Sequence, residues 1–385
     1  MSDRPLPLVI SSMLRPKGVT GVQTHVQQLL RYLASDAASP EATLVTPFSW
    51  GRPLYTPAYA LRRAVDPASA AAGVLWYRHW HEVFLRAALR RELAGRGDCV
   101  ICAQDPPAAR AALAARRHRG QQVVMAVHFR TSQADEWADK GALPRDGRAF
   151  RRIRQLERAV IPRVDRIVYV SRWAQEALTS WLPAAATVPS AVIGNFTAPR
   201  DAPGAEPHGD LVTVGNLEPV KNHRYLLHVL AAAKQAGQEL TLDIFGEGPV
   251  HASLEWLAAT LGVSQQVRLR GFRPDVRDYL PGYRAYVHAS YSESSSLAIM
   301  EAMDAGLPVV AAAIGPLGEL FDDGVEGRYW PLDDPRQAAA ILTGLVDDEQ
   351  ARLKAARAAR DRFARDYDAT VMGPRLTSFL LGGAG

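Results

Sequence analysis

Short runs rich in β-branched residues alternate with longer helical patterns along this chain, and the alternation occurs twice. In the first part, the expected strands are residues 6–12, 42–47, 99–103, 123–127, 166–170 and 191–194. In the second part, they are residues 211–214, 239–245, 266–270, 285–289 and 308–312. Strands that alternate with helices pair in parallel sheets covered by helices on both faces. The sequence therefore predicts an α/β protein with two doubly wound domains.

A proline-rich segment separates the two sets of strands. Residues 198–209 contain three prolines and two glycines, which support neither helix nor strand. A chain of 385 residues also exceeds the size of one ordinary hydrophobic core. We therefore expect one domain over residues 1–197, a linker over 198–209 and a second domain over 210–364, with a C-terminal helix over about 365–385 that packs back on the first domain.

No run approaches the roughly 18 to 20 consecutive apolar residues of a membrane-spanning helix, and the N-terminus lacks a secretory signal pattern. We therefore expect a cytoplasmic location.

Cys99 and Cys102 are the only cysteines. Their C-x-x-C spacing is typical of a redox or zinc site, but residues three apart in a strand point to opposite faces. Two buried thiols are the favoured interpretation.

The second domain contains a pattern typical of anion binding. Lys221 starts a helix after a glycine-containing turn, where its ammonium can lie beside a phosphate attracted to free helix amides. Gly246 follows the next strand and suits a place where backbone approaches a ligand or turns tightly. Taken alone, each is also compatible with an ordinary surface lysine and an ordinary turn.

Residues 290–310 place two carboxylates around a strand-to-helix turn. Serines of the turn are expected to cap a helix that starts at Leu297, so that the amides of Ser296 and Leu297 meet a diphosphate. Glu293 in the turn would reach sugar hydroxyls, and Glu301 inside the helix would reach ribose hydroxyls. Carboxylates suit this purpose because they accept paired hydrogen bonds from vicinal diols. The alternative is that both glutamates are ordinary surface charges.

Together these motifs resemble the donor domain of the retaining glycosyltransferases of family 4, over about residues 211–335. The resemblance implies the GT-B fold, in which two Rossmann-like domains face each other across a cleft. It also implies that Lys221 binds the diphosphate, that Glu301 binds the ribose and that Glu293 binds the transferred sugar. Backbone near Phe272 and Arg273 would face the base. The shared features are Gly215 with Lys221, Gly246-Glu-Gly-Pro249, Arg270-Gly-Phe272, Glu293-x7-Glu301 and Gly306-Leu-Pro-Val-Val310.

Two positions depart from the family pattern. Asn216 stands where the family usually has an arginine, which leaves one phosphate partner fewer. Serines follow Glu293 where the family has Gly-Phe-Gly. In the first domain, Gly21 is similar to the family's glycine loop between donor and acceptor, and His128 resembles its strand-end histidine near the donor sugar. A plain turn and an ordinary buried polar residue are the alternatives for these two.

The resemblance implies a metal-independent hexosyltransferase whose first domain binds the acceptor and whose second domain binds the donor, without a resident cofactor. We expect a UDP-sugar, or failing that a GDP-sugar, and an acceptor hydroxyl on a glycan or lipid-linked molecule of cell-surface polysaccharide or glycolipid synthesis. Nucleic acid is not an expected partner. The alternatives are transfer to a soluble small molecule or sugar phosphate, and noncatalytic binding of a nucleotide sugar.

Charge is distributed unevenly along the chain. Residues 1–200 hold 28 Lys and Arg against 15 Asp and Glu, whereas residues 201–385 hold 17 against 25. Two amphipathic helices are expected in the basic part, over 75–91 and 148–163. Such a surface suits peripheral binding to an anionic membrane at its inner face, and a solvated Arg-rich face is the alternative. The apolar faces are Trp76, Trp80, Val83, Phe84 and Ala87, and Ala149, Ile153, Leu156 and Val160.

Overall fold

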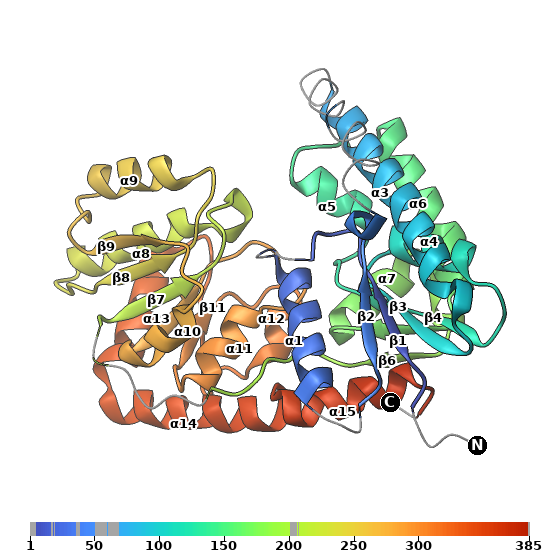
Figure 1. Cartoon of the computed structure of the whole chain (residues 1–385). Helices are drawn as coiled ribbons and strands as arrows, with labels where there is room; N and C mark the ends of the chain where they lie inside the picture. The colour runs from blue at the N-terminus through green and yellow to red at the C-terminus, as the bar shows by residue number, and fades with distance from the viewer. Residues whose placement is uncertain are drawn as a thin grey trace. The chain divides into compact units, whose positions relative to one another are not determined.

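A computed structural model describes residues 5–16, 18, 20–35, 39–50, 60, 69–200, 206 and 208–383 (Figure 1). The chain divides into two compact units. Unit 1 comprises Met1–Asn195 together with Met372–Gly385, and unit 2 comprises Phe196–Val371. Of the expected linker over 198–209, residues 201–205 and 207 lie outside the described residues. The last helix begins at the end of unit 2 and continues into unit 1.

Unit 1 is built on a parallel sheet of six strands in the order β2-β1-β3-β4-β5-β6. The chain steps outward from β1 in both directions, so the connections that follow β1 and β3 diverge at the carboxyl edge. The strands are β1 (Leu8–Ser11), β2 (Ala42–Val45), β3 (Cys99–Ala103), β4 (Gln121–Val127), β5 (Arg166–Tyr169) and β6 (Ser190–Val192). The helices are α1 (Gly21–Ser35), α3 (Ala70–Glu92), α4 (Pro106–Ala115), α5 (Gln133–Asp139), α6 (Arg148–Val160), α7 (Arg172–Trp181) and α15 (Ala369–Leu380).

Unit 2 also has a six-stranded parallel sheet, in the order β12-β11-β10-β7-β8-β9. The strands are β7 (Leu211–Val214), β8 (Leu242–Phe245), β9 (Val267–Gly271), β10 (Ala285–His288), β11 (Val309–Ala311) and β12 (Gly327–Tyr329). The helices are α8 (His223–Gln235), α9 (His251–Thr260), α10 (Val276–Tyr279), α11 (Leu297–Asp304), α12 (Leu317–Leu320), α13 (Pro335–Asp347) and α14 (Glu349–Asp366). The sequence predicts the first five strands, and β12 is an addition.

Short 3₁₀ helices connect several of these elements in both units. They are Pro47–Trp50, Leu93–Gly95, Ile161–Arg163, Pro183–Thr187, Pro219–Lys221 and Leu280–Gly282. One of them, Pro219–Lys221, leads directly into α8 and becomes important for the site described below. Among the described residues, no helix is both long enough and apolar enough to pass through a bilayer.

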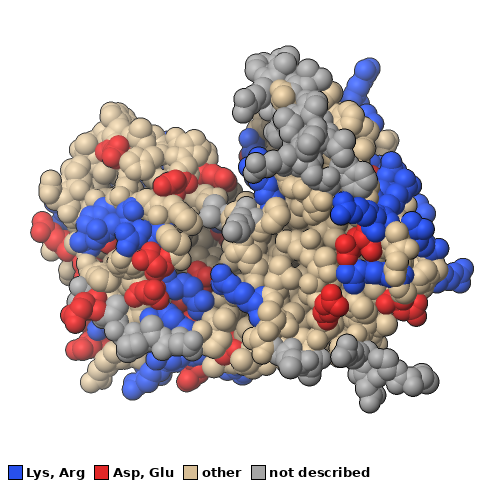
Figure 2. All heavy atoms as spheres, in the orientation of Figure 1, with Lys and Arg blue, Asp and Glu red and all other residues tan. Residues whose placement is uncertain are grey.

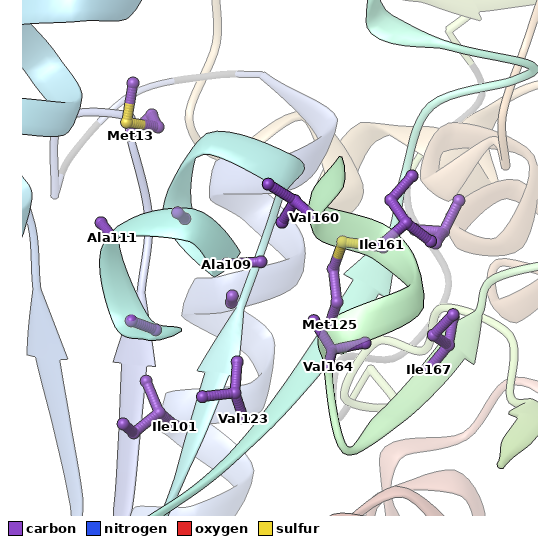
Figure 3. Close-up of a cluster of buried hydrophobic side chains, with 14 of the residues drawn as sticks. Met13, Ile101, Ala109, Ala111, Val123, Met125, Val160, Ile161, Val164 and Ile167 are labelled. Atoms are coloured by element: carbon purple, nitrogen blue, oxygen red, sulfur yellow. The ribbon is translucent and has the colours of Figure 1, made fainter. Parts of the chain in front are cut away.

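The two cysteines are buried free thiols, as the sequence predicts. Cys99 packs in the apolar cluster on one face of the unit 1 sheet, together with Ile101, whereas Cys102 is outside that cluster. Figure 3 shows Ile101, Val123 and Ile167 from neighbouring strands in this cluster. Burial raises the pKa of Cys102 to about 12, so its thiol stays protonated and unreactive at neutral pH.

Helix α3 contains the expected amphipathic segment 75–91, but its most buried side is not the side of the aromatic residues. Arg78 and Glu82 are buried, and Trp76, Trp80 and Phe84 are only half-buried and stack along the helix. These two charged side chains are tolerated in the interior of unit 1 because each has a polar partner. Arg78 donates to Gln133 at 2.5 Å, and Glu82 accepts from the guanidinium Nε of Arg110 at 2.6 Å.

Helix α6 buries Ala149, Ile153 and Val160, in agreement with the expected face. Leu156 is partly buried against the core cluster that contains Val160, and Glu157 is fully buried although the sequence gives no sign of it. Basic side chains gather on the right of unit 1 in Figure 2. The exposed arginines of α6 and the segment after it are Arg148, Arg151, Arg152, Arg158 and Arg163.

Candidate functional site

Two loops meet at the carboxyl edge of the unit 2 sheet, one after β7 and one after β10. These strands are neighbours, and the order of the sheet runs outward from them in both directions. The loops are tied together because the carbonyl of Val220 accepts from the amide of Tyr291 at 2.9 Å and from the hydroxyl of Ser290 at 3.0 Å. Doubly wound sheets bind ligands at this kind of divergence. The side chains of the two loops are therefore the first place to look for chemistry.

Lys221 and Glu293 form a direct ion pair across these loops. The ammonium Nζ lies 2.6 Å from Glu293 Oε1, and the Glu293 side chain is only 8% exposed. His288, the last residue of β10, places Nε2 at 2.9 Å from the same carboxylate oxygen. Burial alone would raise the pKa of Glu293, but Lys221 and His288 hold it down at about 2. The carboxylate is therefore ionised throughout the physiological range.

The sequence identifies Lys221 and Glu293 and misses His288. A polar side chain at the end of an otherwise apolar strand, directly before the serine-rich turn, is the signal that could have found it. His223, the first residue of α8, is also buried beside this group. Burial, with smaller effects of His288 and Lys221, lowers the pKa of His223 to about 3. Lys221 is thus accompanied by a histidine that stays neutral and adds no second positive charge.

Gly246 has a steric reason to be glycine. Its φ is +144°, and a Cβ atom there would lie 2.0 Å from the carbonyl oxygen of Gly215. The loop that carries Asn216 therefore passes directly against the loop after β8. The amide of Gly215 also donates to the carbonyl of Phe245 at 2.9 Å, which holds the two loops in register. This close approach fixes the path of the backbone on its way to Lys221.

Helix α11 starts at Leu297, but the expected serine cap is wrong. Ser296 occupies the N-cap position and its hydroxyl makes no capping hydrogen bond. The hydroxyl of Ser295 is buried without a hydrogen-bond partner among the residues that the structure describes. The turn takes its shape from Ser290 instead, whose hydroxyl also donates to the carbonyl of Ser292 at 2.9 Å. The first amides of α11 have no partner inside the helix, which suits them to an anion.

Glu301 lies partly buried in α11. Burial raises the pKa of its carboxyl above the usual value, and Arg277 opposes that shift. Arg277 is itself engaged, because it pairs with Asp304 at 2.7 Å. The carboxylate of Glu301 makes no hydrogen bond or ion pair to the described residues, so both oxygens remain available to a ligand.

Phe272 and Arg273 follow β9 and are exposed. The amide of Phe272 faces Glu247 Oε1 at 3.5 Å, which connects this segment to the loop of Gly246. Arg273 pairs with Asp275 at 3.2 Å and its guanidinium lies over the ring of Tyr279. The structure shows no direct contact between these two residues and the Lys221–Glu293 pair among its described residues.

In unit 1, His128 directly follows β4 and is buried. Its Nε2 lies 2.9 Å from Gln104 Oε1, and its ring centre lies 4.6 Å from that of His25 in α1. Burial, together with the neighbouring His25, lowers the pKa of His128 well below its ordinary value. Gln104 and His25 carry no motif that the sequence analysis detected. They become neighbours only because β1, β3 and β4 are adjacent in the sheet.

Gly21 is the first residue of α1, and a Cβ atom at this position would meet nothing within 4 Å. Of the loop before it, residues 17 and 19 lie outside the described residues. The glycine with a close neighbour is Gly18, where a Cβ atom would lie 2.2 Å from the side chain of Gln23. Over the described ranges, no three His, Cys, Asp or Glu side chains are grouped to hold a metal ion.

Comparisons with known proteins agree with this architecture. The chain matches the family model of glycosyl transferases group 1 over residues 199–362. It matches the model of glycosyltransferase family 4 over residues 19–201. Among solved structures, it is similar to a sucrose-phosphate synthase from Thermosynechococcus elongatus, with 16% identity, a TM-score of 0.72 and coverage of 97% of this chain and 98% of that one. It is also similar to HepE from Anabaena, solved with UDP and glucose, with 18% identity, a TM-score of 0.69 and coverage of 98% and 100%.

Curated relatives match less than half of this chain. A D-inositol 3-phosphate glycosyltransferase from Salinispora arenicola is 36% identical over 175 residues, which are 42% of this chain and 38% of the relative. A GtfA subunit of a peptide N-acetylglucosaminyltransferase from Streptococcus gordonii is 29% identical over 43% of this chain and 32% of the relative. The chain thus spans less than two thirds of the length of these relatives. The two family matches overlap at residues 199–201 and together run from residue 19 to residue 362, so the chain carries a domain of glycosyltransferase family 4 and a domain of glycosyl transferases group 1, as the two Rossmann-like domains of the GT-B fold.

Proposed function

We propose that the chain transfers a sugar from a nucleotide-sugar donor bound by unit 2 to an acceptor hydroxyl bound by unit 1, with retention of configuration. The observation that carries this proposal is the Lys221–Glu293 pair where β7 and β10 diverge, directly before the N-terminus of α11. A cation beside free helix amides binds a diphosphate, and the facing carboxylates bind hydroxyls. UDP is the preferred nucleotide because the similar Anabaena structure contains UDP and glucose.

The proposed chemistry needs charge stabilisation at the departing diphosphate. Lys221 and the amides of Ser296 and Leu297 supply it without a resident metal or cofactor. The donor's glycosidic bond ionises, and the acceptor hydroxyl attacks from the face that the diphosphate leaves. With Asn216 in place of the usual arginine, Lys221 carries more of this charge than in other members of the family. Glu293 positions the transferred sugar.

A binding experiment tests the donor site directly. UDP and GDP are titrated into the full chain by calorimetry, and Lys221→Met is compared with Lys354→Met. Lys354 lies exposed on α14 in the same unit, so it controls for the loss of one positive charge. Loss of a charged hydrogen bond of about 1.5 to 3 kcal/mol predicts a 10- to 150-fold weaker affinity for UDP in Lys221→Met only. Equal affinities in both variants would remove Lys221 from the site.

The finer proposal concerns the acceptor, a lipid-linked molecule or glycan of cell-surface polysaccharide or glycolipid synthesis. Its support is the exposed arginine surface of α6 and the segment after it, in a part of the chain with a net charge of +13 over residues 1–200. Each basic residue near an anionic bilayer contributes about 1 kcal/mol to binding. The chain would then act at the inner face of a membrane while remaining a peripheral protein.

Vesicle binding separates this acceptor class from a soluble one. The full chain is sedimented with vesicles of phosphatidylglycerol and phosphatidylcholine at low and high salt. Binding that weakens with salt and falls in Arg151→Gln/Arg158→Gln, but not in Arg357→Gln on α14, supports the membrane proposal. A chain that ignores these vesicles at low salt has a soluble acceptor, such as a small molecule or a sugar phosphate.

A further inference from the structure

We propose that Gln104 is a positioning residue that holds His128 as the Nε2–H tautomer, leaving the Nδ1 lone pair of a neutral imidazole to accept a hydrogen bond from a substrate hydroxyl. The inference deepens the proposed function, because it assigns a chemical state and a role to the histidine of the acceptor-side unit. It also assigns a role to Gln104, which none of the sequence motifs includes.

The position of this group in the fold suits a ligand site. Gln104 follows β3 directly, His128 follows β4 directly, and His25 lies on the helix that follows β1. In the sheet of unit 1, β1 and β3 are the adjacent strands from which the order runs outward in both directions. Ligands of doubly wound sheets bind at this divergence, beyond the carboxyl ends of the strands. The three side chains therefore converge at the expected binding edge of unit 1.

The carboxamide of Gln104 is oriented by a second contact. Its Nε2 lies 3.3 Å from Cys102 Sγ, and its Oε1 faces His128 Nε2 at 2.9 Å. A carboxamide oxygen only accepts hydrogen bonds, so the proton must reside on Nε2 of His128. A neutral imidazole carries one such proton, and its Nδ1 then presents a lone pair. The buried thiol of Cys102 thus helps to orient the glutamine that sets the tautomer.

The surroundings keep this imidazole neutral. His128 is buried, and the titratable group that faces it is His25, whose ring packs against it at 4.6 Å. No carboxylate of a described residue lies within ion-pair distance of His128, and the neighbouring His25 lowers the pKa of His128 further. A glutamate at position 104 would accept the same hydrogen bond but would also stabilise the imidazolium. Glutamine supplies the geometry without the charge, so His128 acts as a hydrogen-bond acceptor and not as a cation for the diphosphate.

Nitrogen NMR of the histidine rings tests the tautomer without any substrate. The chain is labelled with ¹⁵N-histidine, and the His128 signals are assigned by their loss in His128→Asn. The wild type should show a protonated Nε2 and an unprotonated Nδ1, with no titration between pH 5 and 8. In Gln104→Glu, the same ring should titrate within this range. A protonated Nδ1 in the wild type would mean that the glutamine donates, and the proposal would be overturned.

Kinetics test the positioning role, with UDP-glucose hydrolysis as the probe reaction. Gln104→Leu should lower kcat roughly tenfold, the effect of one lost hydrogen bond, and leave UDP affinity unchanged. Gln104→Glu should keep the kcat of the wild type at pH 8 and lose it towards pH 6. Gln155→Glu, on the exposed side of α6, is the matched control and should change neither quantity. An unchanged kcat and pH profile in both Gln104 variants overturns the positioning role, whereas failure of the wild type to bind UDP overturns the proposed function instead.

Discussion

The interacting pair at the carboxyl edge of the unit 2 sheet, Lys221 with Glu293, is charged, whereas the pair at the same edge of unit 1, His128 with Gln104, carries no charge. In unit 2, partly exposed Lys221 forms an ion pair with buried Glu293 at 2.6 Å. In unit 1, His128 is paired with an uncharged carboxamide and packs against His25. The difference matches the proposed ligands, because a diphosphate needs a cation and a sugar hydroxyl needs only oriented hydrogen-bond partners.

The two sheets also diverge at different places. Along the chain, unit 2 diverges between its first and fourth strands, β7 and β10, and unit 1 between its first and third strands, β1 and β3. As a result, the two members of the charged pair in unit 2 come from chain segments that are far apart in the sequence. Two sheets with the same number of parallel strands thus assemble their sites from different connections, and the site residues of one unit cannot be inferred by analogy with the other.

The largest expected effect tests whether the histidine site of unit 1 is uncharged. Burial lowers the pKa of His25 to about 4 from the ordinary 6.5, although a side-chain hydrogen bond with Asn195 acts to raise it. As the pH falls, His25 therefore binds a proton in the unfolded chain before it does so in the folded chain. The contribution of neutral His25 to the free energy of unfolding is present above pH 6.5 and is lost towards pH 4. The free energy of unfolding of unit 1 should fall by about 3 kcal/mol between pH 7 and pH 4 because of this one residue. Chemical denaturation of His25→Gln should show a shallower loss, and the exposed His79→Gln should follow the wild type.

The next effect tests the charged pair of unit 2. Glu293→Ala should lower the rate of UDP-sugar hydrolysis by 10- to 150-fold, since the sugar loses a hydrogen bond worth about 1.5 to 3 kcal/mol. UDP affinity should not fall, because Lys221 loses its counterion and is released to the phosphates. A parallel fall in affinity and rate would show that Glu293 serves the nucleotide and not the sugar.

A smaller effect distinguishes the two glutamates of the motif. Glu301→Ala should weaken UDP binding by roughly tenfold, since the ribose loses an acceptor for its hydroxyls. The wild type should prefer UDP to 2′-deoxy-UDP, and Glu301→Ala should lose most of this preference. Calorimetry with both nucleotides measures this coupling. A preference that persists in Glu301→Ala but disappears in Glu293→Ala would exchange the two assignments.

The smallest effect concerns metal ions. If Lys221 and the amides of α11 carry the charge of the diphosphate, exhaustive EDTA treatment should leave UDP binding and hydrolysis unchanged. Restoration of a lost activity by added Mg²⁺ or Mn²⁺ would show that the ion pair of unit 2 is insufficient for the leaving group. The comparison between a charged and a neutral site would then need a bound cation on the unit 2 side.

The strands were the easiest features to predict from the sequence. Runs such as 99–103 and 211–214 are apolar, short and bounded by polar residues, so their bounds agree with β3 and β7. The pairing order was not predictable, because hydrophobic periodicity says which residues are buried and not which strand lies beside which. Gln104 was missed for this reason, since it meets His128 only when β3 and β4 are neighbours. His288 has its partner Glu293 five residues away in the same loop, and its place at the end of an apolar strand was a signal in the sequence.

Two errors have a physical explanation in local interactions. The serines before α11 were expected to cap it, but the loop follows its contacts with Val220 and leaves Ser296 without a capping bond. The amphipathic pattern over 75–91 assigns Trp76, Trp80 and Phe84 to the apolar face of α3, but the helix also buries Arg78, whose guanidinium donates to Gln133. Hydrophobicity alone does not detect a buried charge whose partner lies 55 residues away in the sequence.

The chain enters unit 2 at Phe196 and leaves it at Val371, and these two points are adjacent in the fold. Thr197 donates its amide to the carbonyl of Tyr367 at 3.1 Å and accepts from the amide of Ala369 at 3.1 Å. Unit 2 is therefore one uninterrupted stretch of gene whose two ends lie together in the fold, whereas unit 1 is encoded in two pieces. A single exchange of this stretch would therefore replace the whole of unit 2, in evolution or in the laboratory, whereas replacement of unit 1 needs two exchanges.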